Sequence, residues 1–235
     1  MVPGRHNCFD TGMSRIIVIT GTDTGVGKTL LTGLLAAHLV REGVQVAALK
    51  PICSGDREDA RFLRRAVKDA LPLAAINPWH FRAPIAPLLA ARQAKAAVSL
   101  EEVVAHIRSV ANHAEVVLVE GAGGLLSPLG EGFSTRELQA KLNARLLIVA
   151  ANRLGAVNHV RLTLAALPPR PARQAQVILM APAQPDAASR SNPVLLREFL
   201  APGQWQTLPH FQDTGDFQAM LAQRGVRRVL EALLN

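Results

Sequence analysis

The chain has 235 residues, of which 49% are hydrophobic, enough to bury a sizeable core and to exclude a chain that is disordered throughout. It carries 26 Lys and Arg against 18 Asp and Glu, a formal net charge of +8. The basic residues are scattered, aromatic residues make up only 4% and tyrosine is absent, so we do not expect nucleic-acid binding. Two cysteines, Cys8 and Cys53, are too few for a disulfide scaffold or a four-ligand zinc site. So few cysteines make a reducing compartment the default, and we expect a cytoplasmic protein. Because no apolar run approaches the roughly 20 residues of a membrane span, we expect no membrane partner.

The first part of the chain predicts an extension followed by a strand, a helix and a second strand. Residues 1–13 lack the apolar stretch of a signal peptide, and we expect a disordered extension before a single domain at residues 14–235. Arg15 to Thr20 is a β-branched run without alternation, which is typical of a strand buried on both faces of a parallel sheet. Apolar residues recur at helical spacing from Lys28 to Arg41, and Val44 to Leu49 predicts the next strand.

The same alternation of strands and helices continues along the rest of the chain. We expect helices at Asp56–Ala70, Ser99–His113 and Val157–Leu167, and strands at Glu115–Val119, Arg145–Ala150 and Gln176–Met180. Proline should exclude helices from residues 168–171 and 182–193, whereas the tail from Asp216 to Leu234 predicts a helix. This order predicts one α/β domain, doubly wound, with a mostly parallel sheet and helices on both faces.

A phosphate-binding loop is the strongest motif. The sequence GTDTGVGKT runs from Gly21 to Thr29, between the first strand and the first helix. Glycines let backbone N–H groups turn toward phosphate oxygens, Lys28 can bridge the β- and γ-phosphates, and Thr29 can offer its hydroxyl to Mg²⁺. The spacing departs from the standard loop, because five residues instead of four separate Gly21 from Gly27. The alternative is an ordinary turn that ends by chance in Gly-Lys-Thr.

Three further polar side chains could contribute to a site beside the phosphate loop. Lys50 ends the second strand, where a cation could neutralise a transferred phosphoryl group; otherwise it is a solvated lysine. Asp59 could hold Mg²⁺ or could merely complement the dipole of the helix that starts there. Glu120 ends an apolar strand before the glycines of residues 121–124, so it is either a metal-associated acid or an exposed acid in a tight turn.

Taken together, these blocks resemble those of the dethiobiotin synthetases. GTDTGVGKT, KPICSG, VEGAGG and RLGAVNH follow one another in the family's order, and residues 77–81, NPWHF, resemble its Asn-Pro-aromatic segment. The resemblance covers residues 15–181. It is specific because phosphate-loop switch proteins do not need the block that contains Lys50 and Ser54.

The resemblance implies an enzyme, an ATP-dependent ligase that forms carbon–nitrogen bonds. One amine of 7,8-diaminopelargonic acid adds carbon dioxide to give a carbamate. The carbamate oxygen attacks the γ-phosphate of ATP to give a carbamic-phosphoric anhydride, and the second amine closes the ring, leaving dethiobiotin, ADP and phosphate. Mg²⁺ is the implied cofactor, and the implied assembly is a homodimer with its site at the interface.

The family's functional positions carry over to this sequence motif by motif. The implied catalytic residues are Lys28, Lys50 and Ser54, and the implied metal ligands are Thr29, Asp59 and Glu120. Contacts to the ATP phosphates are implied for Thr24, Gly25, Val26, Gly27, Lys28 and Thr29. Contacts to the substrate are implied for Thr24, Lys50, Ser54, Gly121 and Gly124, and for Gly155, Ala156, Val157 and Asn158 at a helix start in the neighbouring subunit.

The sequence also departs from the family and leaves alternatives open. The family often has an asparagine after the late strand that recognises adenine, whereas Ala181 stands here. The enzyme could therefore accept several nucleoside triphosphates, or it could recognise the base through the backbone of the proline-rich loop. The main alternative function is a nucleotide-switch ATPase of the partitioning or metal-chaperone type. Such proteins commonly carry a further lysine early in the loop, but Thr22 and Asp23 occupy those positions. A second alternative only binds nucleotide and relies on a regulatory or amidating domain elsewhere.

Overall fold

A six-stranded, fully parallel sheet runs through the protein in the strand order β10-β9-β8-β1-β5-β2. The computed structural model describes residues 14–234, so the predicted disorder of residues 1–13 lies outside the described residues. The strands are β1 (Arg15–Gly21), β2 (Val46–Leu49), β5 (Val116–Gly124), β8 (Arg145–Ala151), β9 (Gln176–Met180) and β10 (Trp205–Leu208). The predicted doubly wound α/β fold with a parallel sheet is confirmed.

Both faces of the sheet are covered, which explains the continuous apolar runs of its strands. Val18 of β1 and Val119 of β5 point into one hydrophobic cluster, while Ile17 and Leu118 point into the other. Successive side chains of a strand alternate between faces, so a strand that is buried twice needs apolar residues at every position.

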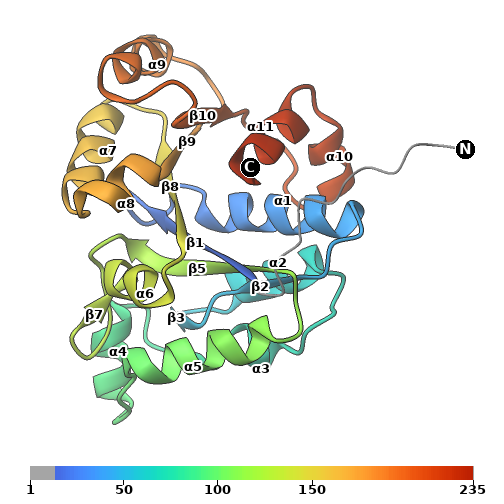
Figure 1. The fold of residues 1–235 in the computed structure, drawn as a ribbon, viewed down its shortest axis with the longest axis vertical. Coiled ribbons are helices and arrows are strands. Elements are labelled where there is room, and N and C mark those ends of the chain that lie inside the picture. Colours follow the sequence, from blue (N-terminus) through green and yellow to red (C-terminus); the bar gives the residue numbers. More distant parts are fainter. Residues whose placement is uncertain (1–13, 235) are drawn as a thin grey trace, which may run out of the picture.

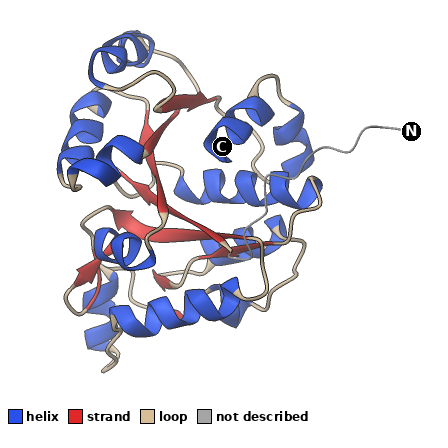
Figure 2. Cartoon of the chain, viewed as in Figure 1, coloured by secondary structure: helices blue, strands red, loops and turns tan. Residues whose placement is uncertain are grey.

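The helices form two layers on opposite sides of the sheet (Figures 1 and 2). One side is covered by α1 (Lys28–Arg41), α2 (Glu58–Ala66), α3 (Leu73–Ile76), α10 (Phe217–Ala222) and α11 (Val226–Leu234). The other is covered by α4 (Pro87–Gln93), α5 (Leu100–Ala111), α6 (Thr135–Leu142), α7 (Ala156–Ala165), α8 (Pro169–Gln174) and α9 (Ala187–Phe199). Two small sheets complete the fold, with β3 (Ile52–Ser54) parallel to β4 (Trp79–Phe81) and β6 (Pro128–Gly130) antiparallel to β7 (Phe133–Ser134). Within residues 14–234, no helix has both the length and the apolar character to cross a bilayer.

Two helices run where proline was expected to exclude them, and that prediction was wrong. Helix α8 begins at Pro169, and proline is tolerated there because the first helical N–H groups have no partner within the helix. Helix α9 contains Pro193 in its interior. Pro193 has no N–H to give to the carbonyl of Ser189, one turn earlier, and the side chain of Asn152 donates to that oxygen instead at 2.9 Å. A tertiary contact therefore replaces the lost helical hydrogen bond.

Other predicted elements keep their type but change their length. The helix expected at residues 99–113 is α5, which opens with a capping box of Ser99 and Glu102. The helix expected at residues 56–70 covers only Glu58–Ala66, because the chain turns at Lys68 and Asp69, which both have positive φ. The single helix expected in the tail is broken into α10 and α11 near Gly225, whose φ is 84°.

Candidate active site

The phosphate loop joins β1 to α1 at the carboxyl end of the sheet. Gly25 and Gly27 have φ of 71° and 100°, and Gly27 is the N-cap of α1, so backbone N–H groups and the positive end of the helix face the loop. Lys28 is buried, and its Nζ donates to the backbone oxygen of Asp23 at 3.0 Å across the loop. A Cβ on Gly21 would lie 2.7 Å from that same oxygen and 3.2 Å from Lys28 Nζ, so only glycine leaves the lysine its place.

The glycine-rich segment after Glu120 lies directly beside the phosphate loop. Gly124 pairs with Gly21 in the sheet, and a Cβ on Gly124 would lie 3.4 Å from the Gly21 oxygen. A Cβ on Gly123 would lie 3.8 Å from the hydroxyl of Thr24. Two segments far apart in the sequence thus form one continuous backbone wall.

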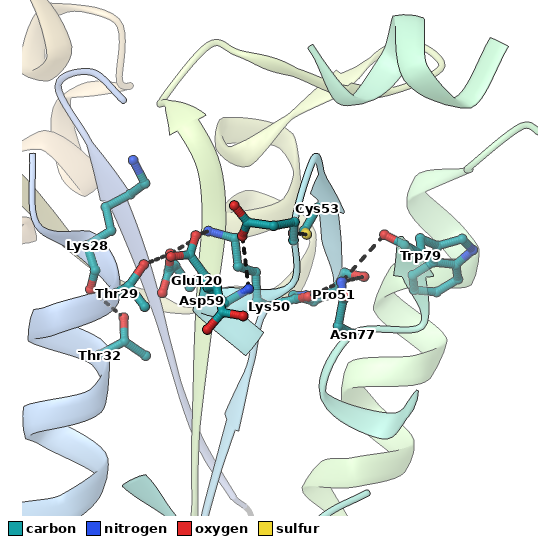
Figure 3. A network of polar contacts seen from close by, with 12 residues as sticks. Lys28, Thr29, Thr32, Lys50, Pro51, Cys53, Asp59, Asn77, Trp79 and Glu120 are labelled. Carbon is teal, nitrogen blue, oxygen red and sulfur yellow. Dashed lines mark hydrogen bonds and ion pairs between the residues drawn. The ribbon is translucent and has the colours of Figure 1, made fainter. Parts of the chain in front are cut away.

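Lys50 stands at the centre of a polar network (Figure 3). Its Nζ lies 2.5 Å from Oδ2 of Asp59 and 2.6 Å from Oε1 of Glu120. The hydroxyl of Thr29 donates to the same Oε1 at 2.8 Å. The register explains this meeting, because Leu49 lies opposite Val119 and each is followed directly by its charged residue.

The network holds Lys50 as a cation. Burial alone would lower the pKa of Lys50, but the charges of Glu120 and Asp59 raise it well above the usual lysine value. Burial alone would raise the pKa of Asp59, and the nearby Lys50 instead holds it below its usual range. The pKa of Lys28 is lowered by burial and then by the charge of Lys50. Lys50 therefore contacts both carboxylates directly, whereas Lys28 feels their charges from its place in the phosphate loop.

The donor set fits a magnesium ion. Oε2 of Glu120 is buried and has no hydrogen-bond partner within residues 14–234, so one oxygen of the acid is free for a ligand. Thr29 and Asp59 add a hydroxyl and a second carboxylate. The described part of the chain holds no group of three or more His, Cys, Asp or Glu that could bind a metal. Mg²⁺ needs no such group, because it usually takes one or two carboxylates and completes its shell with water and phosphate oxygens.

Some of the expected site residues lie outside this network. Ser54 is in β3, where its hydroxyl donates to the oxygen of Ile85 at 2.6 Å. Gly155 is the N-cap of α7 with φ of 88°, and no hydrogen bond or ion pair within residues 14–234 joins residues 155–158 to Lys28 or Lys50. Arg153 approaches the phosphate loop with its Nη2 3.9 Å from Oδ2 of Asp23.

The residues at the end of β9 bear on recognition of the nucleobase. Ala181 follows β9 and donates only its backbone N–H, to the oxygen of Leu208, so its side chain offers no polar contact. The neighbouring Met180 would lie 3.0 Å from a Cβ on Gly27, so this strand end lies beside the phosphate loop.

One residue of the site, Asn77, was given no role in the sequence-based prediction. Its side chain donates to the backbone oxygen of Lys50. The Asn-Pro-aromatic segment that begins at Asn77 was the available signal.

Comparisons with known proteins agree with this geometry. A family model described as an AAA domain matches residues 15–227. The ATP-dependent dethiobiotin synthetase BioD of Anaeromyxobacter sp. (strain Fw109-5) is 37% identical over 215 residues, covering 89% of this chain and 96% of that protein. The BioD of Ralstonia nicotianae (strain ATCC BAA-1114 / GMI1000) is 36% identical over 182 residues, covering 74% of this chain and 76% of that protein.

Solved structures share the fold at low sequence identity. A ParA family ATPase from Chlorobium tepidum TLS has a TM-score of 0.59 at 16% identity, covering 96% of this chain and all of that chain. A chain of the MinC:MinD cell division protein complex of Aquifex aeolicus also has a TM-score of 0.59 at 16% identity, covering 94% of this chain and 96% of that chain. These likenesses support the phosphate-loop fold alone. Because the sequence relatives are closer and are matched over most of their length, the chain belongs to the family of ATP-dependent dethiobiotin synthetases, ligases that form carbon–nitrogen bonds.

Proposed function

We propose that this enzyme carboxylates 7,8-diaminopelargonic acid and closes its ureido ring at the expense of ATP. The observation that carries the proposal is the placement of Lys50 against Glu120, whose Oε1 also accepts from Thr29 at the phosphate loop. A γ-phosphate held by the loop and an anionic acceptor held by Lys50 would then meet above the same carboxylates.

The proposed reaction forms and breaks bonds in three steps. A substrate amine adds to carbon dioxide and loses a proton, which gives a carbamate. A carbamate oxygen forms a bond to the γ-phosphorus while the bond to ADP breaks. The second amine then attacks the carbamoyl carbon, loses a proton and expels phosphate.

The protein's contribution is mainly positioning and fixed charge. A carbamate and a triphosphate repel each other, and Lys28 and Lys50 offset that repulsion as the oxygens approach. We assign the divalent ion to Thr29, Asp59 and Glu120, where it would neutralise phosphate charge when bound. Thr24 and Ser54 would hold the carbamate, Ser54 by turning its hydroxyl away from Ile85, and the backbone of residues 121–124 would line the substrate.

We further propose a homodimer in which residues 155–158 of the neighbouring subunit bind the substrate carboxylate. The start of α7 has no side-chain cap, and the N–H of Ala156 donates to the oxygen of Arg153 at 3.0 Å. Within the described residues no hydrogen bond engages the N–H groups of Val157 and Asn158, so these two could meet an anion. Leu154 and Leu162 are 84% and 61% exposed, which supports a protein contact at this helix. A cytoplasmic location remains a prediction, consistent with the free, buried thiol of Cys53.

The switch-ATPase alternative shares the fold but is not favoured. The ParA family ATPase and the chain of the MinC:MinD complex are similar in structure at only 16% identity. The two relatives at 36–37% identity are named as ATP-dependent dethiobiotin synthetases. In addition, Thr22 and Asp23 occupy the positions early in the loop where switch ATPases commonly have a further lysine.

The deciding experiment measures ADP release with and without 7,8-diaminopelargonate and bicarbonate, with dethiobiotin quantified by mass spectrometry. We expect ADP and dethiobiotin in equal amounts, and a loss of at least a hundredfold in K50M, which keeps the length of the side chain without its charge. Hydrolysis of ATP that is independent of the diamine, or full activity in K50M, would contradict the proposal.

A further inference from the structure

Asn77 is a fully buried amide that the proposed reaction does not use. It follows the last residue of α3, caps that helix and has no exposed surface. A buried amide must satisfy both a donor and an acceptor group, and a side chain of this kind in a core specifies one arrangement of the groups around it.

The donor side of Asn77 holds the backbone of the active-site lysine. Its Nδ2 donates to the carbonyl oxygen of Lys50 at 2.8 Å, and the Pro51 oxygen lies at 3.3 Å (Figure 3). The N–H of Lys50 donates to the oxygen of Ile76 at 3.0 Å. Pro51 has no N–H to extend the sheet, so the backbone at Lys50 is fixed by Ile76 and Asn77 in place of a strand neighbour.

The acceptor side of Asn77 holds the start of the helix that carries Asp59. Arg57, the N-cap residue of α2, donates its Nε to Oδ1 of Asn77 at 3.0 Å and its Nη2 to the backbone oxygen of Asn77 at 2.7 Å. Asp59 follows two residues later. One amide thus ties together the backbones from which the two partners of the 2.5 Å Lys50–Asp59 ion pair project.

We propose that Asn77 is a positioning residue, which sets the place of Lys50 relative to Asp59 and so aims the ammonium group at the reacting oxygens. This inference rests on the proposed function of Lys50. It requires an amide, because a carboxylate cannot donate to the Lys50 oxygen and an alkyl group can neither donate to it nor accept from Arg57. A shift of about 1 Å in such a group can lower a rate about a hundredfold.

The test compares N77D with Q139E. Gln139 is a buried amide in α6 that donates to the oxygen of Ala144 at 2.6 Å, away from the lysine network, so Q139E makes the same chemical change elsewhere. We expect N77D to lower kcat at least tenfold while the affinity for ATP stays within threefold, because Asn77 does not contact the phosphate loop. We expect Q139E to keep kcat within twofold. R57A removes only the contact between Asn77 and the helix that carries Asp59. Because the side chain of Arg57 is partly exposed, R57A keeps the test possible even if N77D does not fold, and we expect it to lower kcat at least threefold.

A second readout does not depend on the reaction. Acetylation by labelled acetic anhydride, measured by mass spectrometry with the exposed Lys95 as reference, reports how firmly Lys50 is held. We expect Lys50 to be labelled at least five times faster in N77D or R57A than in the wild type or Q139E. Unchanged kcat and labelling in both Asn77-network variants, or an equal loss of kcat in Q139E, would overturn the inference. A wild-type protein that makes no dethiobiotin would refute the function instead, and the labelling would still decide the role of Asn77.

Discussion

Lys50 and Glu120 form an ion pair of 2.6 Å that is almost completely shielded from solvent, with side-chain exposures of 7% and 0%. Charges at such a depth persist only when they are paired, because an unpaired buried charge costs several kcal/mol. The pair joins the ends of two neighbouring strands and lies beside the phosphate loop, so it serves both the stability of the sheet and the proposed chemistry.

Removing one member of this pair should destabilise the fold. We expect E120A to lower the free energy of unfolding by about 3 kcal/mol, because Lys50 is then left with only the half-exposed Asp59. The double variant K50M/E120Q removes both charges and should recover most of that stability while remaining inactive. Urea unfolding measures the difference, and equal losses in the single and double variants would contradict the explanation.

A side chain at Gly21 should weaken nucleotide binding. The added Cβ of G21A would press on the Asp23 oxygen and on Lys28 Nζ, so we expect the dissociation constant for ATP to rise at least tenfold. G215A, in an exposed loop, is the matched control and should bind as the wild type does. Titration calorimetry makes the comparison, and wild-type affinity in G21A would show that the loop relaxes around the methyl group.

Nucleotide selectivity should be low. Ala181 presents no side-chain donor or acceptor at the end of β9, and discrimination between bases depends on such groups. We expect kcat/KM for CTP, GTP and UTP to lie within tenfold of the value for ATP, and A181N to increase the preference for ATP. Steady-state kinetics with the four nucleotides tests both statements. A preference for ATP above a hundredfold in the wild type would mean that backbone groups read the base.

Stability should fall in mild acid because of His38. Burial in α1 lowers the pKa of His38; Glu42 and Glu231 act against this shift, whereas Arg227 and Arg41 add to it. Since the folded pKa is the lower one, the unfolded chain binds more protons below about pH 6.5. The stability contributed by neutral His38 is therefore complete above that pH and is lost as the pH falls through the folded value. H38Q should flatten the difference in unfolding free energy between pH 7.5 and 5; identical slopes would rule His38 out.

The contact between Asn152 and α9 can be tested by a rescue. N152A leaves the Ser189 oxygen without its donor, and we expect a loss of about 1–3 kcal/mol in unfolding free energy. P193A restores an N–H that can reach this oxygen within the helix, so N152A should cost less in that background. Chemical denaturation of the four proteins completes the cycle, and strict additivity would exclude the coupling.

The position of the polar network around Lys50 could be predicted from the sequence, because a simple geometric rule places its residues. The carboxyl ends of parallel strands gather at one edge, so Lys50 and Glu120 could be placed beside the loop from their positions after two apolar runs. Prediction from the sequence failed where an element or a side chain is held by a residue that is distant in the sequence. The sequence around Pro193 does not indicate that the Asn152 amide donates to the Ser189 oxygen and so allows a helix there. Likewise, the sequence around Lys50 does not indicate its contact with Asn77. The short strands β3 and β4, which place Ser54, are too brief to leave a pattern.

The strand order also determines the stage of synthesis at which the proposed active site can form. Strand β5 lies between β1 and β2, so the first two strands of the sheet never pair with each other. Oε1 of Glu120, which a ribosome adds long after Thr29 and Lys50, accepts a hydrogen bond from each of them. A nascent chain that ends before β5 therefore lacks the buried acid at the centre of the network, and the proposed active site is completed by insertion of a late segment between two early ones.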